Sequence, residues 1–485
     1  MKAVLAVDVG TSSAKALLLS EMKEVLAEAS ASYPTHTPRE SWIEQNPEDW
    51  WYAFIPSVQK CLEQVVDVEV EAIGISGHMS VMLPLDKHMQ PLNPAITIAD
   101  TRCVEETNWL NEDFADDLSS ATGNIALTAF TLPKLLWFKH HEKNLFDQTS
   151  VMLTVKDYIN YKLTGVLGAE PTDAGNTLLL NYKTRQWNYE LMEKLELPQH
   201  LFPTMHESLE VIGEVTKEAA TILGIKAGIP VITGLADMAS STLGAGLLDE
   251  SRLAITLGTS AQLTQIVEKP SRELLGKFTY HPHALPGKTY LMASLFTGGL
   301  GLQWFAEVLS GFTGASLEQS IGRILTTAER SVPGSRDILF LPFLTGRGSP
   351  AFDATLTASF RNLRREHTGA DMARAVLEGV ALSIRHCFDE MQKYHQTPKE
   401  IVLGGGGSRS TLWGQIIADV TGRSLHLLGT SNAGPLGTAL AAGVAINLFE
   451  MTLFTLSRTV EPSAKNKEVY DLAYQSYVNL CAERI

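Results

Sequence analysis

Cysteine is scarce in this chain of 485 residues. The four cysteines, Cys61, Cys103, Cys387 and Cys481, lie far apart, and no two of them have the spacing of a paired metal-binding motif. The composition therefore fits a reducing compartment and offers no zinc site. We expect a cytoplasmic protein.

Positive charge is also in short supply. The chain has 39 Lys and Arg against 54 Asp and Glu, which gives a formal net charge of −15. Nucleic-acid-binding proteins usually concentrate Lys and Arg on one surface. The balance argues against a nucleic-acid partner, and any phosphate group that the protein binds is expected to be small and locally held.

The sequence lacks an uninterrupted apolar run that would cross a membrane. The uncharged stretch from Ser424 to Phe449 has sufficient length, but Asn432, Pro435 and four glycines interrupt it. We interpret it as a buried turn followed by a helix of small residues. Only Lys2 and a short apolar strand precede Asp8, so we expect neither a secretory signal nor a membrane partner.

What the chain does contain is a Gly-Thr-Ser turn in two similar settings, 248 residues apart. Gly10-Thr11-Ser12 follows the apolar run Ala3 to Val7, and Gly258-Thr259-Ser260 follows Leu253 to Ile255. Each turn leads into a second strand-like run, which predicts a hairpin. A Walker phosphate loop would carry Gly-Lys-Ser/Thr and open a helix, and neither copy does. Two such hairpins indicate a duplicated domain with two anion-binding turns facing one cleft.

The length predicts two or three domains, because a single core rarely grows to this size. Strands alternate with helices in both halves, which predicts α/β architecture. The segment 227–246 is our candidate hinge, since a strand from Ile229 to Gly234 leads into Asp237 and then a run of small residues. We therefore expect one domain over residues 1–245 and a second over 246–485.

Local signals place two helices. Asn46-Pro-Glu-Asp49 predicts a helix start with a capping side chain, a first-turn proline and acids at the positive end of the dipole. Trp50 and Trp51 behind it are more typical of a core than of a sugar site. Apolar residues at helical spacing from 370 to 394 predict a packed helix, in which Gly379 indicates a close backbone contact.

A glycine run, Gly404 to Gly407, follows the strand-like segment 401–403 and precedes a helical stretch over 412–420. Arg409 stands where a dinucleotide-binding fingerprint needs glycine, which disfavours that motif. The bare turn and the helix N-terminus would let a ribose or a flat ring approach the backbone. A plain tight turn explains the same residues, so both interpretations stay open.

Several short segments also follow one another in a distinctive order. They are Asp8–Ser13, Trp42–Pro47 with Trp50-Trp51, Thr131–Trp137, Lys156–Tyr158, Thr172–Ala174, Leu257–Ser260, His283–Pro286, Leu341–Gly346, Arg374–Gly379 and Gly405–Gly407. In this order the chain resembles the FGGY carbohydrate kinases, most closely the xylulokinase branch, from Asp8 to about Ala442.

The resemblance implies an ATP-dependent sugar or polyol kinase of the actin-like fold. Two duplicated ribonuclease H-like α/β domains would surround a central cleft that takes ATP and Mg²⁺, with sugar binding and the first phosphate turn in residues 1–245 and nucleotide binding in 246–485. A homodimer is left open as the assembly. The ATP-binding residues that it implies are Gly10, Thr11, Ser12, Ser13, Lys15, Gly258, Thr259, Gly299, Gln303, Gly405, Gly406, Gly407 and Arg409.

Two aspartates take the chemical roles that the resemblance implies. Asp237 would be the general base, and it would chiefly orient the accepting hydroxyl, because phosphoryl transfer has a loose transition state. Asp8 would hold Mg²⁺ through water, with Asp237 as a second metal contact. Without the resemblance, Asp237 is typical of a helix cap and Asp8 of an ordinary turn.

The residues expected to contact the sugar depart from the xylulokinase pattern. Gly-Gln-Met-His-Gly becomes Gly77-His78-Met79-Ser80-Val81, Trp-Asn-Asp-Gly-Arg becomes Ile98-Ala99-Asp100-Thr101-Arg102, and Met238 replaces an amide after Asp237. A buried polar group rejects a ligand that lacks the matching group, so these changes favour an altered specificity.

We expect a kinase for a ketopentose, of the xylulokinase type. The alternatives are a kinase for another sugar, polyol or aldonate (ribulose, gluconate or glycerol type) and a non-catalytic sugar- or nucleotide-binding protein on the same fold. A filament-forming or chaperone-like ATPase is disfavoured, because Thr131–Trp137 and Arg374–Gly379 resemble sugar kinases specifically.

Overall fold

The structure, a computed structural model, describes residues 1–429, 432–452, 454 and 456–482. The chain forms two compact units, both of the predicted α/β class. Unit 1 comprises Met1–Gly246, Tyr280–Tyr290 and Asn432–Leu453. Unit 2 comprises Leu247–Thr279, Leu291–Ser431 and Phe454–Ile485.

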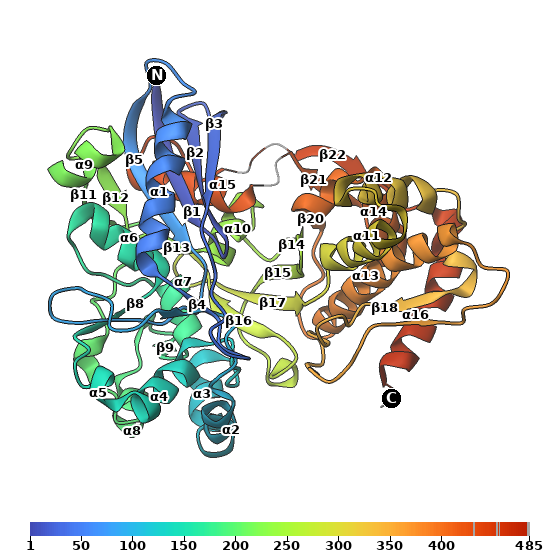
Figure 1. Ribbon diagram of the computed structural model, residues 1–485, viewed down its shortest axis with the longest axis horizontal. Helices are drawn as coiled ribbons and strands as arrows, with labels where there is room; N and C mark the ends of the chain where they lie inside the picture. Colours follow the sequence, from blue (N-terminus) through green and yellow to red (C-terminus); the bar gives the residue numbers. More distant parts are fainter. Residues whose placement is uncertain (430–431, 453, 455, 483–485) are drawn as a thin grey trace. The chain divides into compact units, whose positions relative to one another are not determined.

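The centre of unit 1 is a mixed sheet with the strand order β11-β12-β5-β1-β2-β3 (Figure 1). Strand β1 pairs antiparallel with β2 and parallel with β5, and β13 also pairs with β5. The apolar runs beside the first Gly-Thr-Ser turn therefore form the predicted hairpin. The strands are β1 (Lys2–Val9), β2 (Ser13–Ser20), β3 (Val25–Ser32), β5 (Glu69–Gly77), β11 (Val211–Glu214), β12 (Pro230–Ile232) and β13 (Leu235–Ala236).

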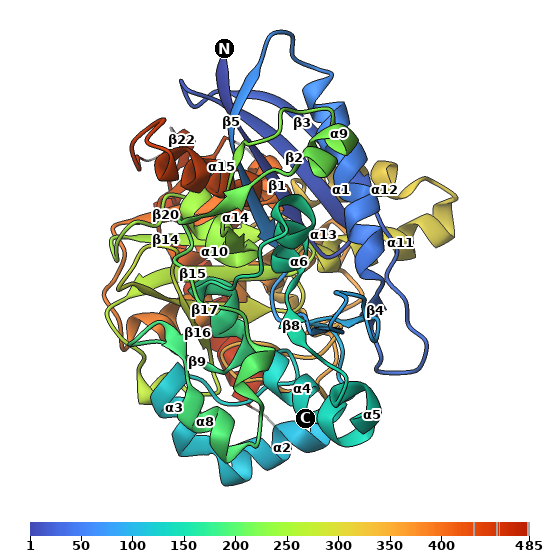
Figure 2. The ribbon, with the colours of Figure 1, turned by 90° about the vertical axis from the view of Figure 1, so that its left-hand side faces the viewer.

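Helices cover both faces of this sheet. Alternate side chains of a strand point to opposite faces, so neighbouring residues of one strand contact different helices. Ile73 and Ile75 of β5 belong to the core shared with α1 and α6, whereas a Cβ added to Gly74 between them would meet Thr438 of α15. Figure 2 shows α1 lying along β1, β2 and β3, and α1 contacts β2 and β3.

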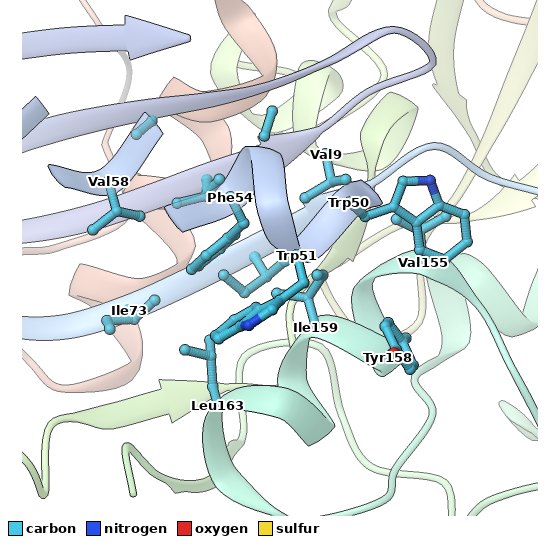
Figure 3. Close-up of a cluster of buried hydrophobic side chains, with 14 of the residues drawn as sticks. Val9, Trp50, Trp51, Phe54, Val58, Ile73, Val155, Tyr158, Ile159 and Leu163 are labelled. Atoms are coloured by element: carbon cyan, nitrogen blue, oxygen red, sulfur yellow. The ribbon is translucent and has the colours of Figure 1, made fainter. Parts of the chain in front are cut away.

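The core on the α1 side holds the two tryptophans that were expected to be buried. Figure 3 shows Trp50 and Trp51 of α1 with Phe54, close to side chains from β1, β5 and α6. Trp50 is fully buried and Trp51 nearly so. Both therefore stabilise the packing of α1 on the sheet, as predicted.

The remaining elements of unit 1 are three short strand pairs and the helices. Three two-stranded pairs are β4 (Glu44–Gln45) with β7 (Ala95–Ile96), β6 (Leu83–Leu85) with β8 (Val151–Leu153), and β9 (Leu180–Asn181) with β10 (Gln186–Trp187). The helices are α1 (Pro47–Leu62), α2 (Val104–Asp113), α3 (Ala115–Thr122), α4 (Thr131–His141), α5 (Lys143–Phe146), α6 (Val155–Thr164), α7 (Pro171–Ala174), α8 (Tyr189–Lys194), α9 (Lys217–Leu223), α10 (Asp237–Gly244) and α15 (Ala433–Ala445).

Unit 2 is built on a sheet with the order β17-β15-β14-β20-β21-β22. The strands are β14 (Arg252–Leu257), β15 (Ala261–Val267), β17 (Thr289–Leu295, preceded by β16, Thr279–Pro282), β20 (Glu400–Gly404), β21 (Leu425–Leu428) and β22 (Leu456–Val460), with the separate pair β18 (Leu339–Leu341) and β19 (Ser359–Arg361). The helices are α11 (Gly299–Thr313), α12 (Leu317–Ala328), α13 (Gly369–Gln392), α14 (Thr411–Thr421) and α16 (Lys467–Ala482).

The two sheets repeat one topology, which confirms the duplication inferred from the two turns. In each, a first strand (β1 or β14) pairs antiparallel with the second (β2 or β15) and parallel with the fourth (β5 or β20), which pairs parallel with a further strand (β12 or β21). That further strand pairs with an antiparallel edge strand, which precedes it in the chain in unit 1 (β11) and follows it in unit 2 (β22). The turns differ in length: Val9 pairs with Ala14, whereas Leu257 pairs with Ala261.

Both helices placed from local signals are present. The Asn46 side chain accepts a hydrogen bond from the Glu48 N–H at 3.2 Å, and Pro47 opens α1. Helix α13 spans the predicted packed segment, and a Cβ on Gly379 would lie 2.3 Å from the Phe340 carbonyl oxygen. The close backbone contact predicted for Gly379 is therefore confirmed.

The uncharged stretch 424–449 forms β21 and the small-residue helix α15, as expected. The turn between them is not buried at Gly429, which is exposed, and Thr430 and Ser431 lie outside the described residues. No helix in the described part of the chain combines the length and the apolar character that a bilayer crossing requires.

Candidate active site

Asp8 lies at the end of β1 in unit 1, opposite Lys15 of β2 and Ser76 of β5 in the sheet register. The Ser76 hydroxyl donates to Asp8 Oδ1 at 2.7 Å. Burial raises the pKa of the Asp8 carboxyl, and the Ser76 hydrogen bond and the Lys15 charge oppose that rise. Asp8 is thus a partly compensated carboxylate rather than an ordinary turn aspartate.

The first Gly-Thr-Ser turn is held from behind by backbone contacts. The Gly10 N–H donates to the Ser13 carbonyl at 3.0 Å, and the Tyr33 hydroxyl donates to the Gly10 carbonyl. The Gln45 amide donates to the Thr11 carbonyl at 2.8 Å. Because these bonds use carbonyls, the exposed side chains of Thr11 and Ser12 stay available to a ligand.

Gln45 is a residue whose role the sequence did not reveal. Its side-chain oxygen accepts from the buried Trp50 indole at 2.9 Å, so the Trp50–Gln45–Thr11 chain connects the core to the turn. The segment Trp42–Pro47 therefore supports the turn structurally. Its only sequence signal was its place in the family resemblance.

Asp237 is the first residue of α10, directly after β13. The cap position belongs to Ala236, so the helix-cap alternative for Asp237 is wrong. The backbone N–H groups of Met238, at 2.7 Å, and Met79 donate to the Asp237 carboxyl. Burial, with the nearby Asp8 carboxylate and a smaller effect of Asp173, raises the pKa of Asp237 to about 8.

Helix α15, which comes late in the chain, also lies next to Asp8 and α10. A Cβ on Gly434 would lie 3.5 Å from Asp8 Oδ2, so the first turn of α15 lies against that carboxylate. The helix is held by α10: the Ser240 hydroxyl donates to the Gly434 carbonyl at 2.6 Å. Cβ atoms on Gly244 and Gly437 would each lie 1.9 Å from a carbonyl oxygen of the other helix. The small residues of α10, which lie in the candidate hinge segment, thus form a surface that packs against α15.

The predicted sugar-binding loop, His78 to Ser80, follows β5 directly. Met79 contacts Asp237 through its backbone, and Met238 is the neighbour of Asp237 in α10. Ser80 adopts a left-handed conformation with φ 64°. Lys134 supports it, because its buried ammonium group donates to the carbonyls of Ser80 at 3.1 Å and Ala129 at 2.7 Å. Lys134 was missed, although a lysine inside the apolar segment Thr131–Trp137 is itself a signal.

The His78 side chain is buried against the α1 core, with its ring 5.9 Å from that of Trp50. Neither of its ring nitrogens has a hydrogen-bond partner among the described residues. Burial, together with the Lys134 charge, lowers the pKa of His78 to about 3. The imidazole is therefore neutral at physiological pH.

Asp100 is fully occupied by protein groups. Its carboxylate accepts from the Ile43 N–H at 2.6 Å and from the Arg102 guanidinium at 2.7 Å. Arg102 also donates to Glu44 and stacks on Trp42 at 3.7 Å. In this arrangement Asp100 holds a loop in place and has no open oxygen for a sugar.

In unit 2, the second turn and the start of α11 are bound to each other. The N–H groups of Gly298 and Leu300 both donate to the Thr259 carbonyl at 2.9 Å, and Gly299 donates to the Gly258 carbonyl at 2.7 Å. Gln303 lies one helical turn further along α11, where its amide donates to Glu307 at 2.9 Å.

The glycine run packs against the same end of β14. It forms a turn between β20 and α14, as predicted, with Gly405 at φ 82° and a hypothetical Cβ 2.6 Å from the Leu257 carbonyl oxygen. Gly406 has no atom within 4 Å of its Cβ position. Arg409 closes the following short helical turn and is exposed. The nucleotide-binding residues expected in unit 2 thus gather around the end of β14.

The donor set in unit 1 fits Mg²⁺. Magnesium prefers oxygen ligands, keeps several waters and is commonly held by one or two carboxylates together with substrate phosphates. Asp8 and Asp237 supply such carboxylates, and burial, the main cause of the raised pKa of each, disfavours their ionised forms in the absence of a cation. No cluster of three or more His, Cys, Asp or Glu ligands occurs among the described residues.

Known proteins resemble the chain over nearly its full length. The N-terminal domain model of the FGGY family of carbohydrate kinases matches residues 3–244, and the C-terminal domain model matches 253–446. The xylulose kinase of Staphylococcus xylosus is 30% identical, and the match covers 99% of each chain.

Solved structures agree with this result. A ligand-bound xylulose kinase from Lactobacillus acidophilus superimposes with a TM-score of 0.91 at 26% identity, covering 99% of this chain and 98% of the other. A gluconate kinase from the same organism superimposes with a TM-score of 0.92 at 26% identity, covering 99% and 97%.

Proposed function

The chain belongs to the FGGY family of carbohydrate kinases, and from that premise we propose that it transfers the terminal phosphate of ATP to a hydroxyl of a ketopentose, with Asp237 as the general base. The observation that carries the proposal is the position of Asp237. It begins α10 close to Asp8, and its carboxyl accepts a hydrogen bond from the Met79 N–H of the His78–Ser80 loop, in the unit that holds the first phosphate turn.

The raised pKa of Asp237 suits a base. A free aspartate, with a pKa of ~3.9, is a weak base, whereas the ionised form of a carboxyl with a pKa of about 8 binds a proton much more strongly. Asp237 would bind the sugar hydroxyl, hold its oxygen in line with the phosphate and take the hydroxyl proton as the bond to phosphorus forms. Because the transition state is loose, orientation comes first and proton transfer follows late.

The two phosphate turns would divide the binding of ATP. Thr11, Ser12, Ser13 and Lys15, after Gly10, would bind the transferred phosphate, and Gly258 and Thr259 would bind the inner phosphates. Gly299, Gln303, Gly405, Gly406, Gly407 and Arg409 would bind the rest of the nucleotide. The gathering of the glycines around the end of β14 supports this assignment.

Mg²⁺ is part of the proposal. Asp8 would hold it through water, with Asp237 as the second carboxylate, and the ion would neutralise phosphate charge during transfer. The scarcity of cysteine supports a cytoplasmic setting, and a homodimer is the assembly to test first, by light scattering.

A second candidate substrate class is an aldonate, another sugar or a polyol. Two differences from the xylulokinase pattern favour it: Met238 of α10 carries no amide, and His78 of the sugar-binding loop packs into the core. The similarity to the gluconate kinase gives the same support. The residues expected to determine the specificity are therefore His78, Met79, Ser80 and Met238. Asp100 would act indirectly, through the loop that it holds.

A coupled assay of ADP release over ketopentoses, ketohexoses, polyols and aldonates tests the substrate. We expect one class to give a kcat/KM at least tenfold above the others. Asp237→Asn should keep ATP binding and lose at least a hundredfold in kcat, because general-base catalysis contributes roughly 10²–10⁴-fold. A near-normal kcat in Asp237→Asn would contradict the assignment of Asp237 as the general base.

A further inference from the structure

A buried polar cluster lies next to the start of α10 in unit 1, and the proposed chemistry does not use it. We call it the Lys156 cluster, and it consists of Lys156, Asp157, Glu170, Thr172 and Asp173. The Lys156 ammonium is paired with Asp157 and lies 3.5 Å from Glu170 Oε1 and 3.7 Å from Asp173 Oδ2. The charged side chains are at most 4% exposed. Burying so much charge is unfavourable unless each group is paired and hydrogen-bonded.

Glu170 organises the cluster. Its Oε1 accepts from the Thr172 hydroxyl at 2.7 Å, and its Oε2 accepts from the Ser208 hydroxyl at 2.6 Å. The N–H groups of Thr172 and Asp173 also donate to this carboxylate, so Glu170 caps α7. Burial alone would lower the pKa of Lys156, but the three carboxylates outweigh burial and raise it. The charged lysine therefore lies beside Glu170, whose two oxygens accept the hydrogen bonds of this cluster.

The Thr172 hydroxyl has two bonds with defined directions. It has one hydrogen, which it donates to Glu170, so its lone pairs face the other way. There it accepts the Ala236 N–H at 2.9 Å. Ala236 is the cap residue of α10, and Asp237 follows it directly. The backbone angles of Ala236 set the direction in which Asp237 leaves the strand.

Two glycines show how tightly this path is packed. A Cβ on Gly77, which directly precedes the sugar-binding loop, would lie 2.9 Å from the backbone nitrogen of Lys156. A Cβ on Gly234 would lie 2.2 Å from the Ile75 carbonyl oxygen and 3.4 Å from Lys156 Cδ. Lys156 therefore contacts the strand ends that carry both the sugar loop and Asp237.

We propose that Thr172, oriented by Glu170, is a positioning residue that fixes the Asp237 carboxyl in the direction needed for phosphoryl transfer. The proposal rests on the proposed role of Asp237. A catalytic group displaced by about 1 Å can lose a hundredfold in rate, so a bond to the preceding backbone N–H is sufficient to matter.

Thr172→Val and Thr172→Ser test the proposal in the full-length protein. Valine has the shape of threonine but cannot accept the Ala236 N–H, and serine keeps the hydroxyl. We expect Thr172→Val to lower kcat by about 10- to 100-fold, with KM for sugar and ATP within about threefold of the parent. Thr172→Ser should keep kcat within about threefold. Should Thr172→Val not fold, Thr172→Ala carries the same expectation.

Thr122→Val is the matched control. The buried Thr122 hydroxyl also makes one donated bond, to the Leu118 carbonyl at 2.8 Å, and accepts one backbone N–H, from Asn124 at 3.1 Å. Its loss should lower the midpoint of thermal unfolding about as much as Thr172→Val does, while kcat stays at the parent value.

Three results would overturn the proposal: parent kcat in Thr172→Val, equal loss in Thr172→Ser, or equal loss in Thr122→Val. None of them bears on the base itself. That assignment fails separately, through normal turnover in Asp237→Asn.

Discussion

The ionised form of Asp237 lowers the stability of the folded protein. Its carboxyl is surrounded by buried groups and by Asp8 and Asp173, and these raise its pKa to about 8. In an unfolded chain the same group ionises near pH ~4. Between these two values the folded state binds a proton that the unfolded state lacks.

The free energy of unfolding of the ligand-free protein should therefore fall as the pH rises from 5 to 8, and Asp237→Asn should make that fall smaller. A shift from ~4 to about 8 corresponds to at most ~5 kcal/mol; because Asp237 is only half-buried, we expect about 1–3 kcal/mol at pH 8. Urea unfolding of both proteins at pH 5, 6, 7 and 8 measures the difference. A difference that does not grow with pH would contradict the expectation.

At this scale, the sequence predicted which residues matter better than it predicted what they contact. The aspartates were found through the resemblance, but the pKa of Asp237 depends on Asp8 and Asp173, which are distant in the chain. Asp100 and His78 show the same limit. Whether a polar side chain faces a ligand or the core depends on packing that a single sequence does not contain.

At the scale of elements, the contact between α10 and α15 leaves no room for a side chain at Gly244 or Gly437. Gly437→Ala would place a Cβ 1.9 Å from the Ser240 carbonyl oxygen, which is backbone and cannot rotate away. We expect a loss of about 3 kcal/mol or more, measured by calorimetry, because the helices have to separate. In contrast, Gly322→Ala in α12 has open space and should stabilise by about 0.5–1 kcal/mol. Equal effects at the two positions would refute the close contact.

The glycine run of unit 2 gives a second test at this scale. Gly406→Ala adds a methyl group into open space, so stability should change by less than ~0.5 kcal/mol. If the nucleotide lies on this turn, as proposed, the methyl group will obstruct it, and KM for ATP should rise about 5- to 10-fold. An unchanged KM would favour the plain tight turn.

Elements with a strong local signal were predictable. The cap at Asn46, the periodicity behind α13 and the two hairpins each depend on residues close in sequence. The identity of α15 as a helix was also predictable, but its partner was not. Its contact with α10 joins segments almost 200 residues apart, and small residues alone do not say which helix they meet.

For the whole molecule, unit 1 needs three separate stretches of the chain. The sequence predicted a single boundary near residue 245. A repeat reveals the number of domains, but it does not reveal that later segments of the chain return to the first domain. A fragment ending at residue 246 would lack α15 and expose the apolar surfaces of β1, β5 and α10 that it covers. We expect this fragment to unfold without cooperativity and to aggregate.

Circular dichroism and thermal unfolding of fragment 1–246 measure this, with a second fragment that also carries residues 280–290 and 432–452 on flexible linkers as the comparison. The linked fragment should regain a sharp transition, because the helix would again cover the sheet. A cooperative transition in the shorter fragment would show that α15 is dispensable.

The late position of α15 has a consequence for biosynthesis. A ribosome releases the residues of β1 first, but the helix that completes their burial emerges only after residue 445. Throughout most of translation the nascent N-terminal half carries an uncovered apolar sheet face, which makes it a client for chaperones. Asp8 of the proposed catalytic centre lies against the first turn of α15. The centre can therefore form only late in the synthesis of the chain.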